Sequence, residues 1–96
     1  MPSLKLTKPI MVDGTEKKEL TYNLDDLTGE DIQRVTSELM KKGVPVSTIE
    51  LDPVFHAALF ACSAGLAIED LNRFSAKDYT AASKVVRDFF LEDTAE

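Results

Sequence analysis

The only histidine, His56, and the only cysteine, Cys62, set the limits on nucleophilic and metal chemistry in this chain. Any Ser/His/Asp or Cys/His catalytic arrangement would have to include His56. The two residues lie six positions apart in a segment with helical periodicity, which is about 600° around a helix, so they do not share a face. We therefore expect His56 to be a partly exposed helix residue and Cys62 a small buried hydrophobe. A single thiol also excludes an internal disulfide and a thiolate-rich zinc site.

Adjacent acidic residues are the other groups that could do chemistry, either as a general acid and base or as ligands of a cation. They are Asp25-Asp26, Glu30-Asp31 and Glu69-Asp70. The second pair falls in the first turn of a predicted helix, where the helix dipole favours anions without any catalytic role. The DxDxDG spacing of a calcium loop is absent, and the four glycines are isolated rather than gathered into a phosphate-binding loop. The sequence predicts no enzyme, no cofactor and no metal site.

The charge balance excludes further partners. The 96 residues carry 17 acidic and 11 basic side chains, a net charge of −6. Nucleic acids and anionic membrane surfaces require clustered Lys and Arg, so neither is expected as a partner. The longest apolar-rich stretch, residues 54–64, is too short to span a bilayer, and the N-terminus lacks the apolar core of a signal peptide. We expect a cytoplasmic protein.

Residues 4–24 predict a β-hairpin with its turn at Asp13-Gly14. Apolar residues alternate along both arms: Leu4, Leu6, Ile10 and Val12, then Leu20, Tyr22 and Leu24. A two-residue turn would pair even-numbered with odd-numbered residues and spoil this face. We therefore expect a three-residue loop, residues 12–14, with Gly14 in the left-handed conformation. Pro9 cannot donate a ladder hydrogen bond, so it should lie at an open edge or a bulge.

Three helices and one short helical turn follow, each with a recognisable start or stop. Thr28 and Asp31 form a capping box for the first helix, which ends at Gly43 and whose buried stripe should contain Ile32, Val35, Leu39 and Met40. Residues 43–51 should be an extended linker packed against the body. Asp52 and Pro53 start the second helix, which Gly65 ends. A short turn covers residues 68–74, and Ser75 caps the last helix with Asp78 at the capping-box position.

These elements predict one α+β domain over residues 1–96, with an N-terminal hairpin packed on a bundle of three to four helices. The hairpin spans residues 4–24 and the helical part residues 28–91. The polar, acidic tail over residues 92–96 should be frayed. The second helix is apolar around nearly its whole circumference, so it must either be central or dock another molecule on its outer side.

In order and spacing, these segments resemble the tail assembly chaperones of contractile-tailed bacteriophages and related prophages. The residues that carry the resemblance are Leu6 to Ile10, Asp13-Gly14, Leu20-Thr21-Tyr22, Leu27 to Ile32, Ala64-Gly65-Leu66, Glu69-Asp70-Leu71, Phe74 to Tyr79, Val86 and Phe89. Each piece alone is a turn or a cap, but together they cover nearly the whole chain.

The resemblance implies a non-catalytic role in the cytoplasm of the bacterial host. Such proteins bind the tape measure protein, a long helical chain that sets tail length, and keep it soluble. They assist polymerisation of the tail tube around it and leave before the mature virion is complete. Further partners implied are the tail tube protein and a longer form of the chaperone made by ribosomal frameshifting. A homo-oligomer is also compatible with the apolar second helix.

Four residues are candidates for docking the client: Phe60 and Ala64 on the outward side of the second helix, and Phe90 and Leu91 at the end of the last one. One face of each helix already satisfies the core, so we expect the side chains on the other face to be available for docking. The competing interpretation is that the hairpin covers the second helix and Phe90 completes the core. Two other functions stay open: a small phage-encoded adaptor or inhibitor of a host protein that uses the acidic residues 25–31, and a structural tail or head-completion subunit.

Overall fold

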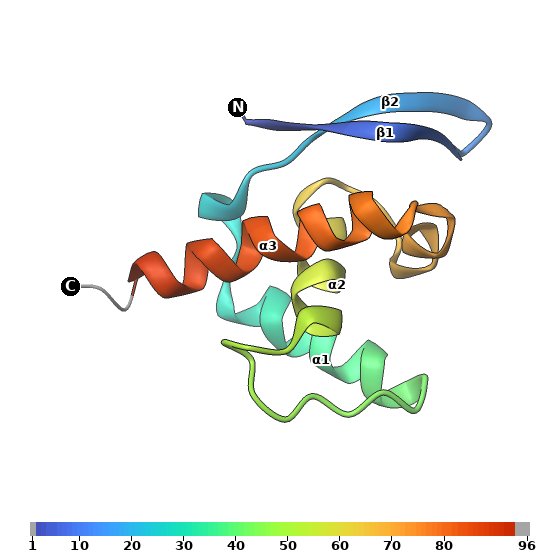
Figure 1. Ribbon diagram of the computed structural model, residues 1–96. Coiled ribbons are helices and arrows are strands. Elements are labelled where there is room, and N and C mark those ends of the chain that lie inside the picture. Colours follow the sequence, from blue (N-terminus) through green and yellow to red (C-terminus); the bar gives the residue numbers. More distant parts are fainter. Residues whose placement is uncertain (1, 94–96) are drawn as a thin grey trace.

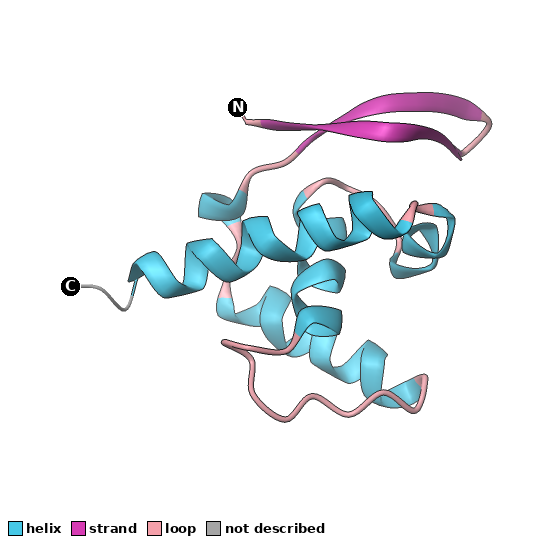
Figure 2. Ribbon diagram, in the orientation of Figure 1, coloured by secondary structure: helices cyan, strands magenta, loops and turns pink. Residues whose placement is uncertain are grey.

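A two-stranded hairpin lies along one side of a helical body (Figures 1 and 2). The computed structural model describes residues 2–93, with side chains described up to residue 91. In chain order the elements are β1 (Ser3–Val12), β2 (Thr15–Thr21), the 3₁₀ turn η1 (Leu24–Asp26), α1 (Gly29–Lys41), α2 (Pro53–Ser63), the 3₁₀ helix η2 (Ile68–Arg73) and α3 (Ala76–Asp93). The predicted α+β class, an N-terminal hairpin with three to four helices, is confirmed.

The hairpin turn differs from the expected one. Val12 pairs directly with Thr15, so the loop has two residues rather than three. Both loop residues, Asp13 (φ 52°) and Gly14 (φ 80°), have positive φ, as a type I′ turn requires. The alternation of apolar residues predicted that even-numbered residues pair with even-numbered ones, and a three-residue loop was expected to produce this register. The two-residue loop does not produce it.

A bulge of several residues in β1 restores the even-to-even pairing instead. Near the turn Ile10 faces Lys17, but further along Lys5 faces Glu19. Four residues of β1, numbers 6–9, therefore lie opposite the single residue Lys18. Beyond this bulge Leu4 pairs with Leu20, so apolar residues again meet apolar residues. Pro9 lies within the bulge, as predicted, where its missing N–H costs no ladder bond.

The first helix begins as the sequence predicts. The Thr28 hydroxyl accepts from the Asp31 backbone N–H at 3.3 Å, and the Asp31 carboxylate accepts from the Thr28 N–H at 3.0 Å. Val35 and Leu39 are buried and Ile32 is partly buried, but Met40 is 65% exposed. Met40 follows Leu39 by about 100° of helix rotation, so the turn that points Leu39 inward carries Met40 out of the predicted stripe.

The second helix is the centre of the molecule. α2 contacts α1, α3, η1 and η2, which together surround it. Its residues from Phe55 to Ala61 are all buried, His56 included. Central burial explains why the helix is apolar all round. The expectation that His56 would be partly exposed is wrong: it is 1% exposed, and its Nε2 lies 2.7 Å from the carbonyl oxygen of Ile49.

Residues 43–51, the linker expected from the sequence, connect α1 to α2 and pack in part against this body. Val44, Val46 and Ile49 are partly buried against the core. Gly43, with φ 80°, ends the preceding helix, and the Asp52 carboxylate caps α2 by accepting from the N–H groups of Val54 and Phe55. We call residues 43–52 the strap.

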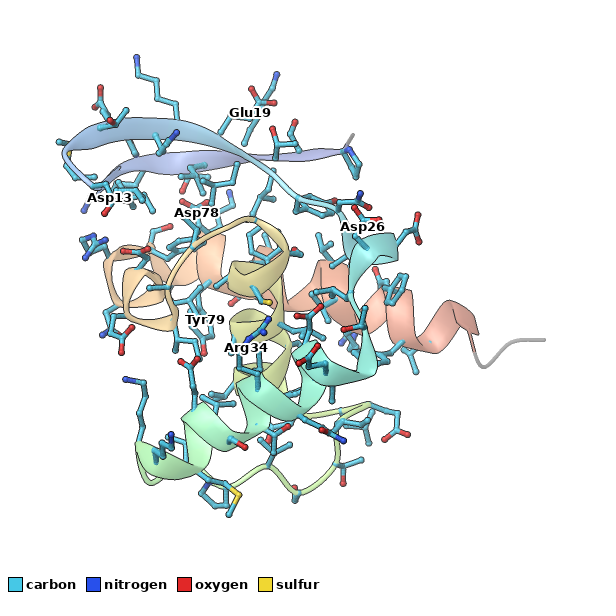
Figure 3. The ribbon with its side chains drawn as sticks, turned by 180° about the vertical axis from the view of Figure 1, so that it is seen from behind. Asp13, Glu19, Asp26, Arg34, Asp78 and Tyr79 are labelled. Carbon is cyan, nitrogen blue, oxygen red and sulfur yellow. The ribbon has the colours of Figure 1, made fainter. Side chains whose placement is uncertain are left out.

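The last helix is longer than expected. α3 runs to Asp93, so residues 92 and 93 continue the helix instead of belonging to a frayed tail. Residues 94–96 lie outside the described part of the chain. Ser75 caps the helix, since its hydroxyl accepts from the Asp78 N–H at 3.1 Å. The Asp78 carboxylate, however, is directed toward the hairpin (Figure 3).

Candidate protein-binding surface

The docking residues expected on α2 lie beneath the hairpin end of the molecule. Phe60 is fully buried, and its ring lies 5.1 Å from that of Tyr22, which follows β2. This corrects the expectation that Phe60 points outward, because the chain leaving the hairpin covers that side of α2. Ala64 is partly buried and lines a hollow of about 450 Å³ between β2 and the turn at Gly65.

The two docking residues expected on α3 lie at the other end of α2. Phe90 is partly buried and stacks on His56, with 5.6 Å between ring centroids. It also lies against Phe55, at 6.4 Å, so it contributes to the core as the competing interpretation held. Leu91 is 44% exposed. The structure therefore brings Phe90 and Leu91 together but does not join them to Phe60 and Ala64.

Several exposed apolar side chains were not among the expected docking residues. Among the described residues, the large exposed hydrophobic side chains are those of Met11, Met40, Leu51, Val54 and Leu91. Leu51, at the tip of the strap, is 64% exposed although it directly precedes the cap of the most buried helix. Sequence reasoning missed it because the strap was expected to pack as a whole.

Leu51 borders a groove between the strap, the start of α2 and one side of α3. The groove has a volume of about 360 Å³. Its lining includes Leu51, Pro53, His56, Ser83, Lys84 and Arg87. Thr80 also lines the groove, and with Ser83, Lys84 and Arg87 it lies on one side of α3. From Thr80 to Arg87 the groove runs along the helix for about two turns, or about 10 Å.

Two hydrogen bonds fix the walls of this groove. The buried hydroxyl of Ser83 donates to the carbonyl oxygen of Pro53 at 2.9 Å, which joins α3 to the start of α2. The contact of His56 Nε2 with the Ile49 carbonyl holds the strap to the same helix. The two carbonyl groups belong to Ile49 and Pro53, which precede and follow Leu51 in the chain, so these bonds fix the position of Leu51. The groove is preformed rather than created by a partner.

The charged residues that line the groove are both cations. Lys84 and Arg87 are separated by one turn of α3, about 4.5 Å along its axis. No carboxylate is among the residues lining the groove in the described part of the chain. Arg87 lies 3.8 Å from Asp88, but both side chains are about half exposed, so this pair is weak. In a chain of net charge −6, this groove is locally basic.

Three of the acidic residues singled out from the sequence, Asp31, Glu69 and Asp70, make structural contacts. Asp31 completes the α1 cap and pairs with Arg34; the Thr28 N–H is the largest cause lowering the pKa of Asp31. Glu69 pairs with Lys42, whose hydrogen bond lowers the pKa of Glu69. Asp70 accepts from the Ala67 N–H and pairs with Arg73. Among the side chains that the structure describes, none of the groups of three or more His, Cys, Asp or Glu is close enough together to hold a metal ion.

The sulfur of Cys62, the remaining candidate, accepts a 3.7 Å hydrogen bond from the Arg34 guanidinium. Cys62 is only partly buried, and His56 lies elsewhere on the helix, so the two do not combine. The long, apolar stretch needed to cross a bilayer occurs in none of the helices of the described chain.

These features are those of a small binding module built around a buried central helix. A family model described as phage tail assembly chaperone proteins, E, or 41 or 14, matches residues 3–91, nearly the entire chain. The chain therefore belongs to the phage tail assembly chaperone family, which is non-enzymatic. Comparison with curated proteins and with solved structures gave no significant match.

Proposed function

We propose that this protein binds the tape measure protein of its phage, keeps it soluble and assists polymerisation of the tail tube around it. The observation that carries the proposal is the family match over residues 3–91. The match agrees with the resemblance seen in the hairpin, the helix caps and the last helix. Only a few residues at each end of the chain lie outside the matched range. Family membership gives tail proteins as the partners, and the tape measure protein is the partner we propose among them.

The surface of the chain supports this role physically. A tape measure chain presents apolar helical stripes until the tube covers them, and such stripes aggregate when exposed. The chaperone offers Leu51, Val54 and Leu91 as exposed apolar side chains around α2 and α3. Its net charge of −6 would keep the complex dispersed. Apolar contact and charge repulsion together prevent the client from associating with itself.

The proposal also covers where the protein acts and which other proteins it binds. We infer that the protein acts in the cytoplasm of the bacterial host and leaves before the virion matures. The tail tube protein and a frameshifted longer form are its further partners. Self-association would use the same apolar surface and would therefore compete with the client.

Co-expression with the tape measure protein of the same phage tests the proposal. The tape measure protein should move from the pellet to the supernatant after lysis and should co-purify with the chain. The control is the Phe60→Asp variant, because a charge at this fully buried position should unfold the chain and so remove any solubilisation that requires the folded protein. If the client stays insoluble with the folded wild-type chain, the proposed function is wrong.

A further inference from the structure

We propose that the groove between Leu51 and α3 is the client-binding site and that it takes an amphipathic helix with acidic residues beside its apolar stripe. The inference rests on the proposed function, because it names the surface used there and the chemistry of the segment bound. It extends that function by predicting which part of a long helical client the chaperone selects.

The shape of the groove suits a helix lying along α3. Its floor includes Pro53, Ser83 and the buried face of His56, and its exposed wall is Leu51. A volume of about 360 Å³ accommodates the apolar side chains of one or two helical turns, at the lower end of the range for binding pockets. Since Ser83 and His56 hold the walls in place, the partner loses little affinity in ordering them.

The charge of the groove selects the partner. Lys84 and Arg87 stand one helical turn apart, so two carboxylates at positions i and i+3 or i+4 of a bound helix could each face one cation. The weak contact between Arg87 and Asp88 leaves the guanidinium able to bind a second carboxylate. Nucleic acid is disfavoured because the rest of the chain is strongly acidic. The groove thus favours an acidic protein helix.

The experiment co-expresses the tape measure protein with each version of the chain, purifies the pair and measures how tightly the two bind. The test variants are Lys84→Glu/Arg87→Glu, which reverses the charge, and Leu51→Ser, which removes the exposed apolar wall. Two matched controls change the same chemistry elsewhere: Lys17→Glu/Lys18→Glu on exposed β2, and Met40→Ser, whose side chain is 65% exposed against 64% for Leu51. Circular dichroism verifies that all variants remain folded.

We expect the charge-reversed variant to bind about tenfold more weakly or worse, because two ion pairs become two repulsions. Leu51→Ser should also weaken binding, and both controls should match the wild type. Raising the salt to about 0.5 M should reduce wild-type affinity and narrow its difference from the charge-reversed variant. Reversing the acidic residues of the client to lysine should restore binding to the charge-reversed variant.

The outcomes separate this inference from the function on which it rests. If the wild-type chain binds the client and the groove variants bind it equally well, the groove assignment is overturned while the proposed function stands. If the wild-type chain does not bind, both are overturned. If the wild-type chain instead forms a dimer that Lys84→Glu/Arg87→Glu abolishes, the groove receives a second copy of this chain and the inference is wrong.

Discussion

Replacing Asp78 should release the hairpin from the helical body. Its carboxylate is only 2% exposed and accepts from the backbone N–H of Thr7 at 2.9 and 3.0 Å and from that of Lys8 at 3.2 Å. These two donors belong to the β1 bulge, where the ladder to β2 is interrupted. The Asp78 carboxylate, on α3, therefore provides the hydrogen-bond acceptors that β2 does not provide for the N–H groups of Thr7 and Lys8 (Figure 3).

The cost of losing this contact follows from its hydrogen bonds. A hydrogen bond to a charged group contributes about 1.5–3 kcal/mol, and the Asp78 carboxylate accepts from the N–H groups of two residues. We expect Asp78→Ala to lower the free energy of unfolding by about 3–5 kcal/mol. Asp78→Asn should cost about 1–3 kcal/mol, because the amide keeps one acceptor but turns a donor toward a backbone N–H.

Urea unfolding followed by circular dichroism measures both values. Hydrogen exchange should show that the amides of Thr7 and Lys8 lose protection before those of α2. The matched control is Asp88→Asn, an exposed carboxylate on the same helix, which should change stability by less than about 0.5 kcal/mol. A loss below about 1 kcal/mol for Asp78→Ala would show that the bulge does not depend on this residue.

The same carboxylate predicts how stability depends on pH. Burial raises the pKa of Asp78, but the N–H groups of Thr7 and Lys8 and the hydroxyls of Thr7 and Ser75 outweigh it, so the pKa lies below its usual value of 3.8. The folded state therefore binds this proton less readily than the unfolded chain does. The stabilisation is fully present above pH 4 and is lost as pH falls through the lowered pKa. The Asp78→Asn variant should lack this component of acid denaturation.

Three further predictions concern the core, the turn and the virion. Phe60→Ala should lower the free energy of unfolding by about 3–5 kcal/mol in a urea melt, because it opens a cavity beside Tyr22; a folded variant of wild-type stability would return Phe60 to the list of surface residues. Gly14→Ala should cost about 1 kcal/mol in the same melt, since φ is 80° there, whereas Gly29→Ala, in the first turn of α1, should not destabilise. Mass spectrometry of purified virions should find the chain absent or far below one copy per tail subunit; a stoichiometric amount would favour a structural subunit.

The helix boundaries could be predicted because their signals are local. Thr28 with Asp31, Asp52 with Pro53, and the positive-φ glycines at 43 and 65 determine starts and stops through contacts within a few residues. The hairpin and its register could be predicted only in part. The alternation of apolar residues showed correctly that Leu4 and Leu20 share a face, but sequence alone did not distinguish a longer loop from a bulge.

The tertiary roles were harder to predict, because they depend on which elements meet. His56 was expected to be partly exposed, yet the strap and Phe90 enclose it. Asp78 was expected to complete a cap, but its carboxylate serves residues 70 positions or more away in the chain. The groove was missed for the same reason: Leu51, Ser83 and Arg87 become neighbours only when the strap, α2 and α3 pack together.

The separation between Thr7 and Asp78, 71 residues, also bears on synthesis. At about 5–20 residues per second, the ribosome completes residue 78 roughly 4–14 s after residue 7. During this interval a nascent hairpin has no acceptor for the amides of its bulge and lacks the helix against which it rests. Final closure of the domain is therefore postponed until the start of α3 has been synthesised, so chains that terminate before residue 78 should be recognised by their open N-terminal end and degraded.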